Sequence, residues 1–307
     1  MKTTTVKRLM RRIISYNAVR HTLAKLRNWI VSEDQPVSTT PLNEIFHPEE
    51  DQWVRNHYID VVDRFVDFVR GSEELEGKRL LDVGSGDCIV DYGLLSLPLK
   101  HVQGLDIVPV EYKSMEELPG RIERAGCTPP EDLSRFSHAH YDGARFPFED
   151  DTFDIVFSWS AFEHVTQVRE ALQEIARVLR PDGFAFIQVY PWYQSRPGSH
   201  LMDHVDVPFF HLRWGKEEVR EKLEEVANRK IESKVFLLGY LWDEFTTLNK
   251  FSADSFYECA KDAGLRATKA RLISHDEDLS CAPKSFKLSE LMVAGTMMIL
   301  KHAKVNT

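Results

Sequence analysis

The chain has 307 residues, of which 43% are hydrophobic and 28% charged, so it can bury a large core and is not a disordered chain. Its longest apolar stretch, Leu291 to Leu300, is far shorter than the roughly 20 residues that span a bilayer. The N-terminus lacks the apolar core and small-residue cleavage site of a secretory signal. The four cysteines form no CxxC pair, which argues against a zinc knuckle or a thioredoxin-like site. We therefore expect a cytoplasmic protein.

Charge is distributed unevenly along the chain. The formal net charge is -9, yet residues 1–30 contain eight Lys and Arg residues and no acid. The acidic body argues against a nucleic-acid partner. The apolar spacing in the basic head predicts two short amphipathic helices. For this arm, contact with an anionic membrane surface, packing on its own domain or a partner subunit, and a mitochondrial transit peptide all stay open.

The body of the chain alternates between strands and helices. Residues 33–48 contain three prolines and are typical of a linker, and apolar residues at helical spacing then predict a helix from about Glu49 to Val69. Strands are predicted at Arg79–Val83, His101–Val108, Ser137–Tyr141, Phe153–Ser158 and Phe184–Tyr190, with helices at Cys88–Leu97 and Val168–Leu179. This alternation indicates right-handed crossovers and a largely parallel sheet covered on both faces.

The alternation stops after Tyr190. Residues 191–214 are loop-like, aromatic and rich in histidine. Helices are then predicted at Gly215–Arg229 and Ser252–Ala263, and two final strands at Leu265–Ser274 and Leu291–Lys301, which can form an antiparallel hairpin. The pattern predicts a doubly wound α/β fold with seven strands. We divide it into an arm and linker (1–48), a core (49–192), an inserted lid after the fifth strand (193–251) and a segment that completes the sheet (252–307).

The most informative segment is the end of the first predicted strand, Asp82-Val83-Gly84-Ser85-Gly86. Its two glycines let the backbone turn sharply and approach a ligand. Asp106 follows Gly84 by 22 residues at the end of the next strand, where an acid can accept hydrogen bonds from both ribose hydroxyls. The dinucleotide fingerprint needs a third glycine where this chain has Ile89. The acid at position 82 would also repel phosphate and attract a cationic amino-acid group.

These motifs resemble those of the class I S-adenosylmethionine (SAM) dependent methyltransferases, closely over about Gly77 to Pro191 and more loosely over Ser252 to Ala303. The resemblance implies a Rossmann-like fold in which Asp82 and the glycine turn hold the methionine end of SAM, Asp106 the ribose and Asp142 the adenine amino group. Cys88 departs from the small residue, often glycine, of many members. The cofactor-binding residues so implied are Asp82, Gly84, Ser85, Gly86, Asp106, Ile107, Asp142, Gly143 and Ser158.

The acceptor should lie where the fifth predicted strand ends, because ligands of open α/β sheets bind at the carboxyl ends of the strands. Aromatic residues there suit a ring, sugar or acyl face, and a packed lid has the same composition. His164 belongs to a stretch that resembles the family's methyl end, where a histidine also often supports the fold. The predicted substrate-binding residues are His164, Tyr190, Trp192, Tyr193 and His211.

Three histidines and two aspartates between positions 200 and 211 favour acid–base chemistry or metal binding, without a template spacing for either. A hydroxyl acceptor must lose a proton, which neutral histidine can accept near pH 7. We predict His200 and His204 as catalytic residues and assign no metal ligand. The predicted function is SAM-dependent methylation of a small molecule or glycoconjugate, with oxygen favoured over nitrogen or carbon. A nucleic-acid or protein methyltransferase and a catalytically silent partner protein are the alternatives. The sequence specifies neither the acceptor nor the oligomeric state.

Overall fold

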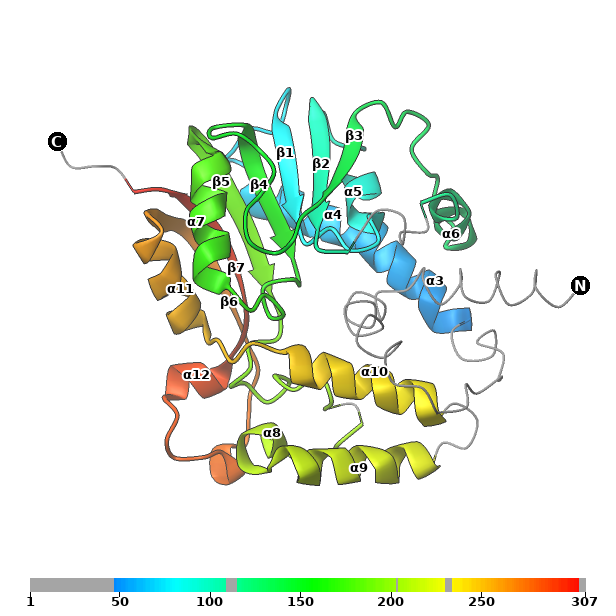
Figure 1. The fold of residues 1–307 in the computed structure, drawn as a ribbon, viewed down its shortest axis with the longest axis vertical. Coiled ribbons are helices and arrows are strands. Elements are labelled where there is room, and N and C mark those ends of the chain that lie inside the picture. The colour runs from blue at the N-terminus through cyan, green and yellow to red at the C-terminus, as the bar shows by residue number, and fades with distance from the viewer. Residues whose placement is uncertain (1–46, 109–114, 203, 230–233, 304–307) are drawn as a thin grey trace, which may run out of the picture.

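The computed structural model describes residues 47–108, 115–202, 204–229 and 234–303. Its seven strands form one sheet in the order β3-β2-β1-β4-β5-β7-β6 (Figure 1). The first five run parallel, and β7 runs antiparallel to both β5 and β6. The strands are β1 (Arg79–Val83), β2 (His101–Asp106), β3 (Phe136–His140), β4 (Phe153–Trp159), β5 (Leu179–Val189), β6 (Leu265–Ser274) and β7 (Val293–His302). The predicted mostly parallel sheet with a C-terminal hairpin is confirmed.

Helices cover both faces of this sheet. One face packs against α4 (Val61–Val69) and α5 (Ile89–Leu94), and the other against α7 (Val168–Val178) and α11 (Ala253–Asp262). The rings of Phe65 on α4 and Phe186 on β5, for example, lie 5.0 Å apart. Such apolar contacts on both faces explain why β1, β4 and β5 are continuous hydrophobic runs.

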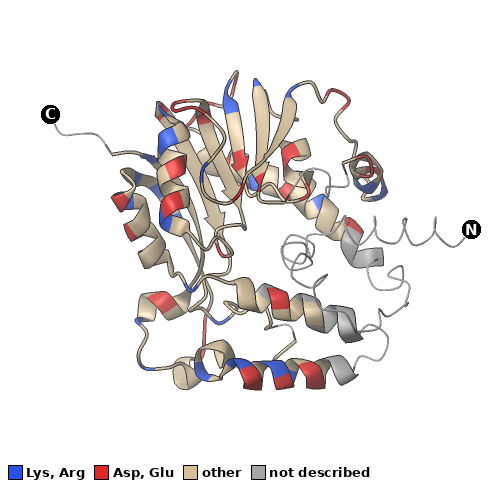
Figure 2. Cartoon of the chain, in the orientation of Figure 1, with Lys and Arg blue, Asp and Glu red and all other residues tan. Residues whose placement is uncertain are grey.

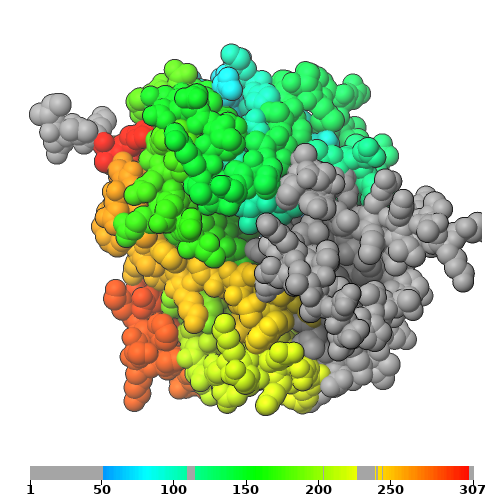
Figure 3. Space-filling view, viewed as in Figure 1, coloured from blue at the N-terminus to red at the C-terminus, as the bar shows by residue number. Residues whose placement is uncertain are grey.

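A third group of helices lies at the carboxyl ends of the parallel strands, at the bottom of Figure 1. It comprises α8 (Phe210–Arg213), α9 (Lys216–Arg229) and α10 (Lys234–Thr247), all within the predicted insertion. These helices share an apolar core with the preceding loop, in which Leu201 and Val205 pack near Leu223 and Phe245. Acidic and basic residues follow one another along the coloured part of α9 (Figure 2), and the group forms the yellow block in Figure 3. Its role as a lid stays a prediction.

Several elements differ from the sequence expectations. The first described helix is α3 (His47–Arg55), which continues through a π-helical turn (Asn56–Asp60) into α4. Four described helices were not predicted: α6 (Leu118–Arg124), α8, α10 and α12 (Leu288–Met292). The short α6 has a proline in its first turn, and α10 is apolar on most sides, so neither shows one clear stripe. The strand β5 begins at Leu179 and not at Phe184 as predicted, so Pro181, Asp182 and Gly183 lie inside it, beside a register shift against β4.

The remaining elements are a 3₁₀ turn (Leu279–Cys281) and α12 (Leu288–Met292), both in the link between β6 and β7. Among the described helices, none is both long enough and apolar enough to cross a membrane. The predicted arm helices lie outside the described residues, so membrane or subunit contact through the arm stays a prediction.

Candidate active site

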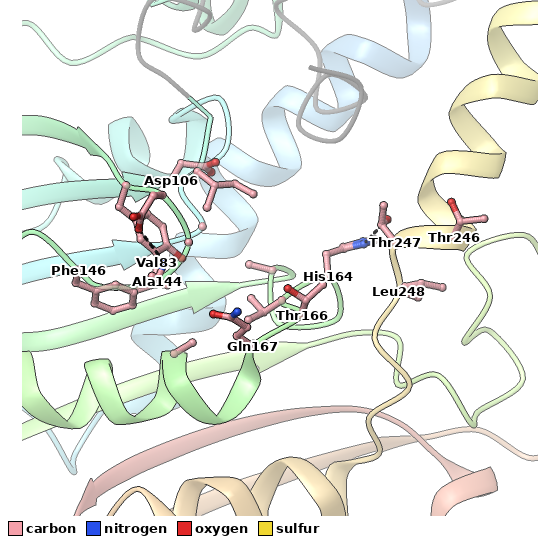
Figure 4. Close-up of a pocket in the computed structure, with 18 residues that line it drawn as sticks. Val83, Asp106, Ala144, Phe146, His164, Thr166, Gln167, Thr246, Thr247 and Leu248 are labelled. Atoms are coloured by element: carbon pink, nitrogen blue, oxygen red, sulfur yellow. Dashed lines mark hydrogen bonds between the residues drawn. The ribbon is translucent and has the colours of Figure 1, made fainter. Parts of the chain in front are cut away.

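A cavity of about 600 Å³ opens at the carboxyl ends of β1, β2 and β4 (Figure 4). This size suits a small-molecule ligand. The wall is built by five segments: the ends of β1 and β2, the loop after β3, the turn between β4 and α7, and the end of α10. The predicted residues that line it are Gly84, Asp106, Ile107, Asp142, Gly143 and His164.

The glycine turn is fixed against the end of β2. Gly84 and Gly86 have φ angles of 84° and 55°, a region that glycine adopts without steric cost. The Gly84 N–H donates to the Leu105 carbonyl at 2.8 Å, and the Gly86 N–H donates to Asp106 Oδ2 at 2.7 Å. The other oxygen, Oδ1, accepts from the Val108 N–H at 2.8 Å. These bonds hold the Asp106 carboxylate, only 2% exposed, at the cavity wall.

An apolar surface lies next to Asp106. Ile107 is 48% exposed and lines the cavity, which is unusual for a large aliphatic side chain. Gly143 faces it with φ 89°, and a Cβ there would lie 3.8 Å from Ile107. The Asp142 carboxylate accepts from the Ala144 N–H at 2.9 Å, which shapes this turn. The geometry leaves room for a flat ring beside Ile107.

The other three predicted cofactor residues lie in or next to β1 and β4. Asp82 is 3% exposed within β1. The Ser85 hydroxyl lies 3.1 Å from His138 Nε2, and the buried Ser158 hydroxyl donates to the Val83 carbonyl at 2.8 Å. None of the three is among the described residues that line the cavity.

Two of the predicted acceptor-side histidines lie together. His164 lines the cavity, and its Nδ1 is 3.1 Å from the Thr247 hydroxyl at the end of α10 (Figure 4). The ring of His200 is 5.2 Å from the ring of His164. Burial lowers the pKa of His200 to about 4, so its imidazole is neutral at pH 7.

The other predicted acceptor-side residues do not reach the cavity within the described part of the chain. Trp192 is buried and its indole N–H donates to Thr296 at 3.3 Å. His211 Nε2–H donates to the Tyr193 carbonyl at 2.7 Å, while the Tyr193 hydroxyl donates to the His211 carbonyl. The Tyr190 ring meets His275 edge-on, and the His204 N–H donates to the Leu201 carbonyl.

Sequence reasoning missed Asn249, which secures the turn after β4. Its side-chain amide donates to the carbonyls of Phe162 and Val165, and its backbone N–H donates to the Glu163 carbonyl at 2.8 Å. Phe162 and Val165 precede Asn249 by 87 and 84 residues in the sequence. No local motif marks such a contact, because it exists only when the segment after α10 folds onto the turn that follows β4.

Known proteins are similar to parts of this chain. A family described as a methyltransferase domain matches residues 81–187. An uncharacterized methyltransferase from Mycolicibacterium paratuberculosis is 32% identical over 129 residues, 42% of this chain and 46% of that protein. A ubiquinone biosynthesis O-methyltransferase from Neisseria meningitidis is 27% identical over 140 residues, 44% and 52% of the two chains. The chain thus spans about half the length of these curated relatives.

Two further proteins are similar over longer stretches. A phthiotriol/phenolphthiotriol dimycocerosates methyltransferase from Mycobacterium ulcerans is 24% identical over 216 residues, 68% of this chain and 63% of that protein. The structure of an S-adenosylmethionine dependent methyltransferase from Mesorhizobium loti superposes with a TM-score of 0.45 at 14% identity, covering 75% and 93% of the two chains. The match thus places residues 81–187, within the seven-stranded sheet described above, in a region similar to the methyltransferase domain family.

Proposed function

We propose that this protein transfers a methyl group from SAM to a hydroxyl oxygen of a small-molecule acceptor, such as a lipid-like molecule or a glycoconjugate. The observation that carries the proposal is the Asp106 carboxylate, held at the wall of the cavity next to exposed, apolar Ile107. A fixed acid beside a flat apolar surface is what a nucleoside requires.

The residues present fit SAM along the length of the cavity. Asp106 would accept hydrogen bonds from the ribose hydroxyls, and Ile107 with the Asp142–Gly143 turn would hold the adenine ring. The glycine turn between Gly84 and Gly86 would approach the methionine end closely. The sulfonium would then lie toward the turn after β4, where His164 forms part of the wall.

SAM supplies a methyl group on a cationic sulfur: the acceptor oxygen bonds to the methyl carbon, the carbon–sulfur bond breaks with its electron pair on sulfur, and the hydroxyl proton leaves. Neither His200 nor His204 is among the described residues of the wall, but the ring of His200 lies against His164, which lines the cavity. We therefore propose that His200 takes part in removing the proton of the acceptor hydroxyl. The protein itself supplies alignment and exclusion of water.

The acceptor class is supported by the wall and by the relatives. Val165 and Leu248 offer apolar contact, and Thr166, Gln167 and Thr246 offer hydrogen bonds. One relative is named an O-methyltransferase of ubiquinone biosynthesis and another a methyltransferase of dimycocerosates. An acceptor that combines an apolar body with a hydroxyl group fits both observations.

The proposal is tested by calorimetry with SAM, its demethylated product and NAD. Wild type should bind the first two and not NAD. Asp106→Ala should weaken SAM binding by about 10- to 150-fold, because about 1.5–3 kcal/mol of hydrogen bonding is lost. The matched control is Asp182→Ala, an exposed acid near the start of β5, which should bind SAM as wild type does. Equal affinity of Asp106→Ala and wild type would remove Asp106 from the site.

A further inference from the structure

Three side chains that can ligate a metal ion converge at the acceptor end of the cavity. Glu163, His164 and His200 each offer one ligand atom, and these atoms all lie within 4.8 Å of one another. Glu163 and His164 belong to the turn after β4, whereas His200 comes from the segment that follows β5. The fold therefore assembles the cluster from two separate segments. One member of the cluster, His164, lines the cavity.

The hydrogen bonds of His164 set its ring for ligation. The Thr247 hydroxyl lies 2.8 Å from the Asp243 carbonyl, to which it can only donate. With its proton used there, Thr247 Oγ1 accepts from His164 Nδ1–H at 3.1 Å. This assignment leaves the lone pair of the ring on Nε2. Histidine ligands of metals typically donate their other N–H to an oxygen in this way, which fixes tautomer and orientation.

His200 presents a nitrogen whose partner is missing from the described protein. Its Nε2 is buried and accepts or donates no hydrogen bond within the described residues. Its backbone has φ 58°, a left-handed conformation that is uncommon for residues other than glycine. A buried polar atom without a partner costs free energy, and such strained positions concentrate at functional sites. Both observations favour a ligand at this nitrogen.

Glu163 adds negative charge to the same place. Its side chain is 4% exposed, so its carboxylate meets the two histidines in the protein interior and not in bulk water. Asn249 fixes the backbone on each side of it through the carbonyls of Phe162, Glu163 and Val165. The carboxylate is thus held close to the two imidazoles by a rigid turn.

We propose that Glu163, His164 and His200 bind a divalent first-row transition cation at the acceptor end of the cavity. Two imidazole nitrogens and one carboxylate oxygen are a donor set that suits Zn²⁺, Fe²⁺ or Mn²⁺. Mg²⁺ and Ca²⁺ instead prefer oxygen ligands throughout. Three protein ligands leave coordination positions for water or for an acceptor oxygen.

The role of this cation in the reaction rests on the proposed function. A hydroxyl that binds a divalent cation loses its proton to water more easily, because the charge lowers its pKa. The oxygen keeps the electron pair that forms the new bond to the methyl carbon, and the sulfur of SAM retains the pair of the broken bond. His200 then acts by holding the cation, which is how it takes part in proton removal.

The test uses the full-length protein, freed of metal by a chelator and titrated with Co²⁺, whose visible absorption reports ligation by protein side chains. Wild type should bind a single Co²⁺ ion that Zn²⁺ displaces and Mg²⁺ does not. His200→Ala and Glu163→Gln should each weaken Co²⁺ binding by about 100-fold or more, since even residues that only orient a ligand change affinity by about 10- to 100-fold. Thr247→Val, which removes the bond to His164, should weaken binding by about 10-fold.

The matched control is His101→Ala. His101 is the first residue of β2 and so lies at the amino ends of the strands, whereas the cluster lies beyond the carboxyl ends, and the variant should keep wild-type Co²⁺ binding. Circular dichroism and SAM titration on every variant show that the fold and the cofactor half are intact. Absence of a Co²⁺ spectrum in wild type, or wild-type affinity in both His200→Ala and Glu163→Gln, would overturn the cation site. Co²⁺ binding together with failure to bind SAM would support the cation site and overturn the proposed function.

Discussion

The two ends of the cavity are built in different ways. The cofactor end is formed by short segments that each follow one parallel strand, and its central bond joins residues 20 apart, Gly86 and Asp106. The acceptor end joins the turn after β4 to Thr247 and Asn249, which lie 83 to 87 residues away in sequence. Under the proposed function, cofactor binding would therefore depend on local backbone geometry, whereas acceptor chemistry would depend on how the inserted segment packs.

Removing Asn249 should test this difference most strongly. Asn249→Ala leaves the carbonyls of Phe162 and Val165 without their donor, so we expect the free energy of unfolding to fall by about 2–4 kcal/mol. The affinity for SAM should stay close to wild type, because the residues proposed to hold its ribose and adenine are elsewhere. Urea unfolding and calorimetry measure the two quantities. Asn56→Ala, in the helical run on the far side of the sheet, is the control and should change little.

A large loss of SAM affinity in Asn249→Ala would contradict the division into two ends. It would show that the turn after β4 positions the cofactor as much as the acceptor. Wild-type stability would instead show that the contacts between α10 and this turn contribute little to the fold.

The same difference explains what the sequence could predict. Gly84, Gly86 and Asp106 lie next to one another, because the strand, the turn and the acid follow one another within one βαβ unit. The sequence could not show whether Trp192 and His211 line the cavity or pack inside the protein. A packed layer and a binding wall are both rich in aromatic residues and histidine, and in the structure both side chains bond within the protein. Asn249 carries no local signal, because its partners become neighbours only in the folded chain.

Acid should weaken the histidine-rich segment in particular. Desolvation lowers the pKa of His211 to about 4, although its bond to the Tyr193 carbonyl opposes the shift. Between pH 6.5 and 4 the unfolded chain binds a proton that the folded chain excludes, so stability is full above that range and falls as pH falls. From pH 7 to pH 5 this residue should cost about 2 kcal/mol.

Urea unfolding at the two pH values in wild type and His211→Gln measures this contribution. Glutamine retains an N–H that can donate to the Tyr193 carbonyl, and it does not titrate. The variant should therefore lose about 2 kcal/mol less than wild type on acidification. An identical pH dependence in both proteins would show that His211 already carries a proton in the folded state or stays accessible to water.

The smallest effect is expected from the basic arm. All described residues that line the cavity lie between Val83 and Leu248, and the helix α3 begins at His47. A chain that lacks residues 1–46 should therefore bind SAM as the full chain does, within the error of calorimetry. Comparing the two proteins on vesicles that contain anionic lipid tests the membrane prediction separately, since only the full chain carries the eight cations. A strong loss of SAM affinity on deletion would instead make the arm part of the cofactor wall, and the cofactor end would then also depend on contacts distant in sequence.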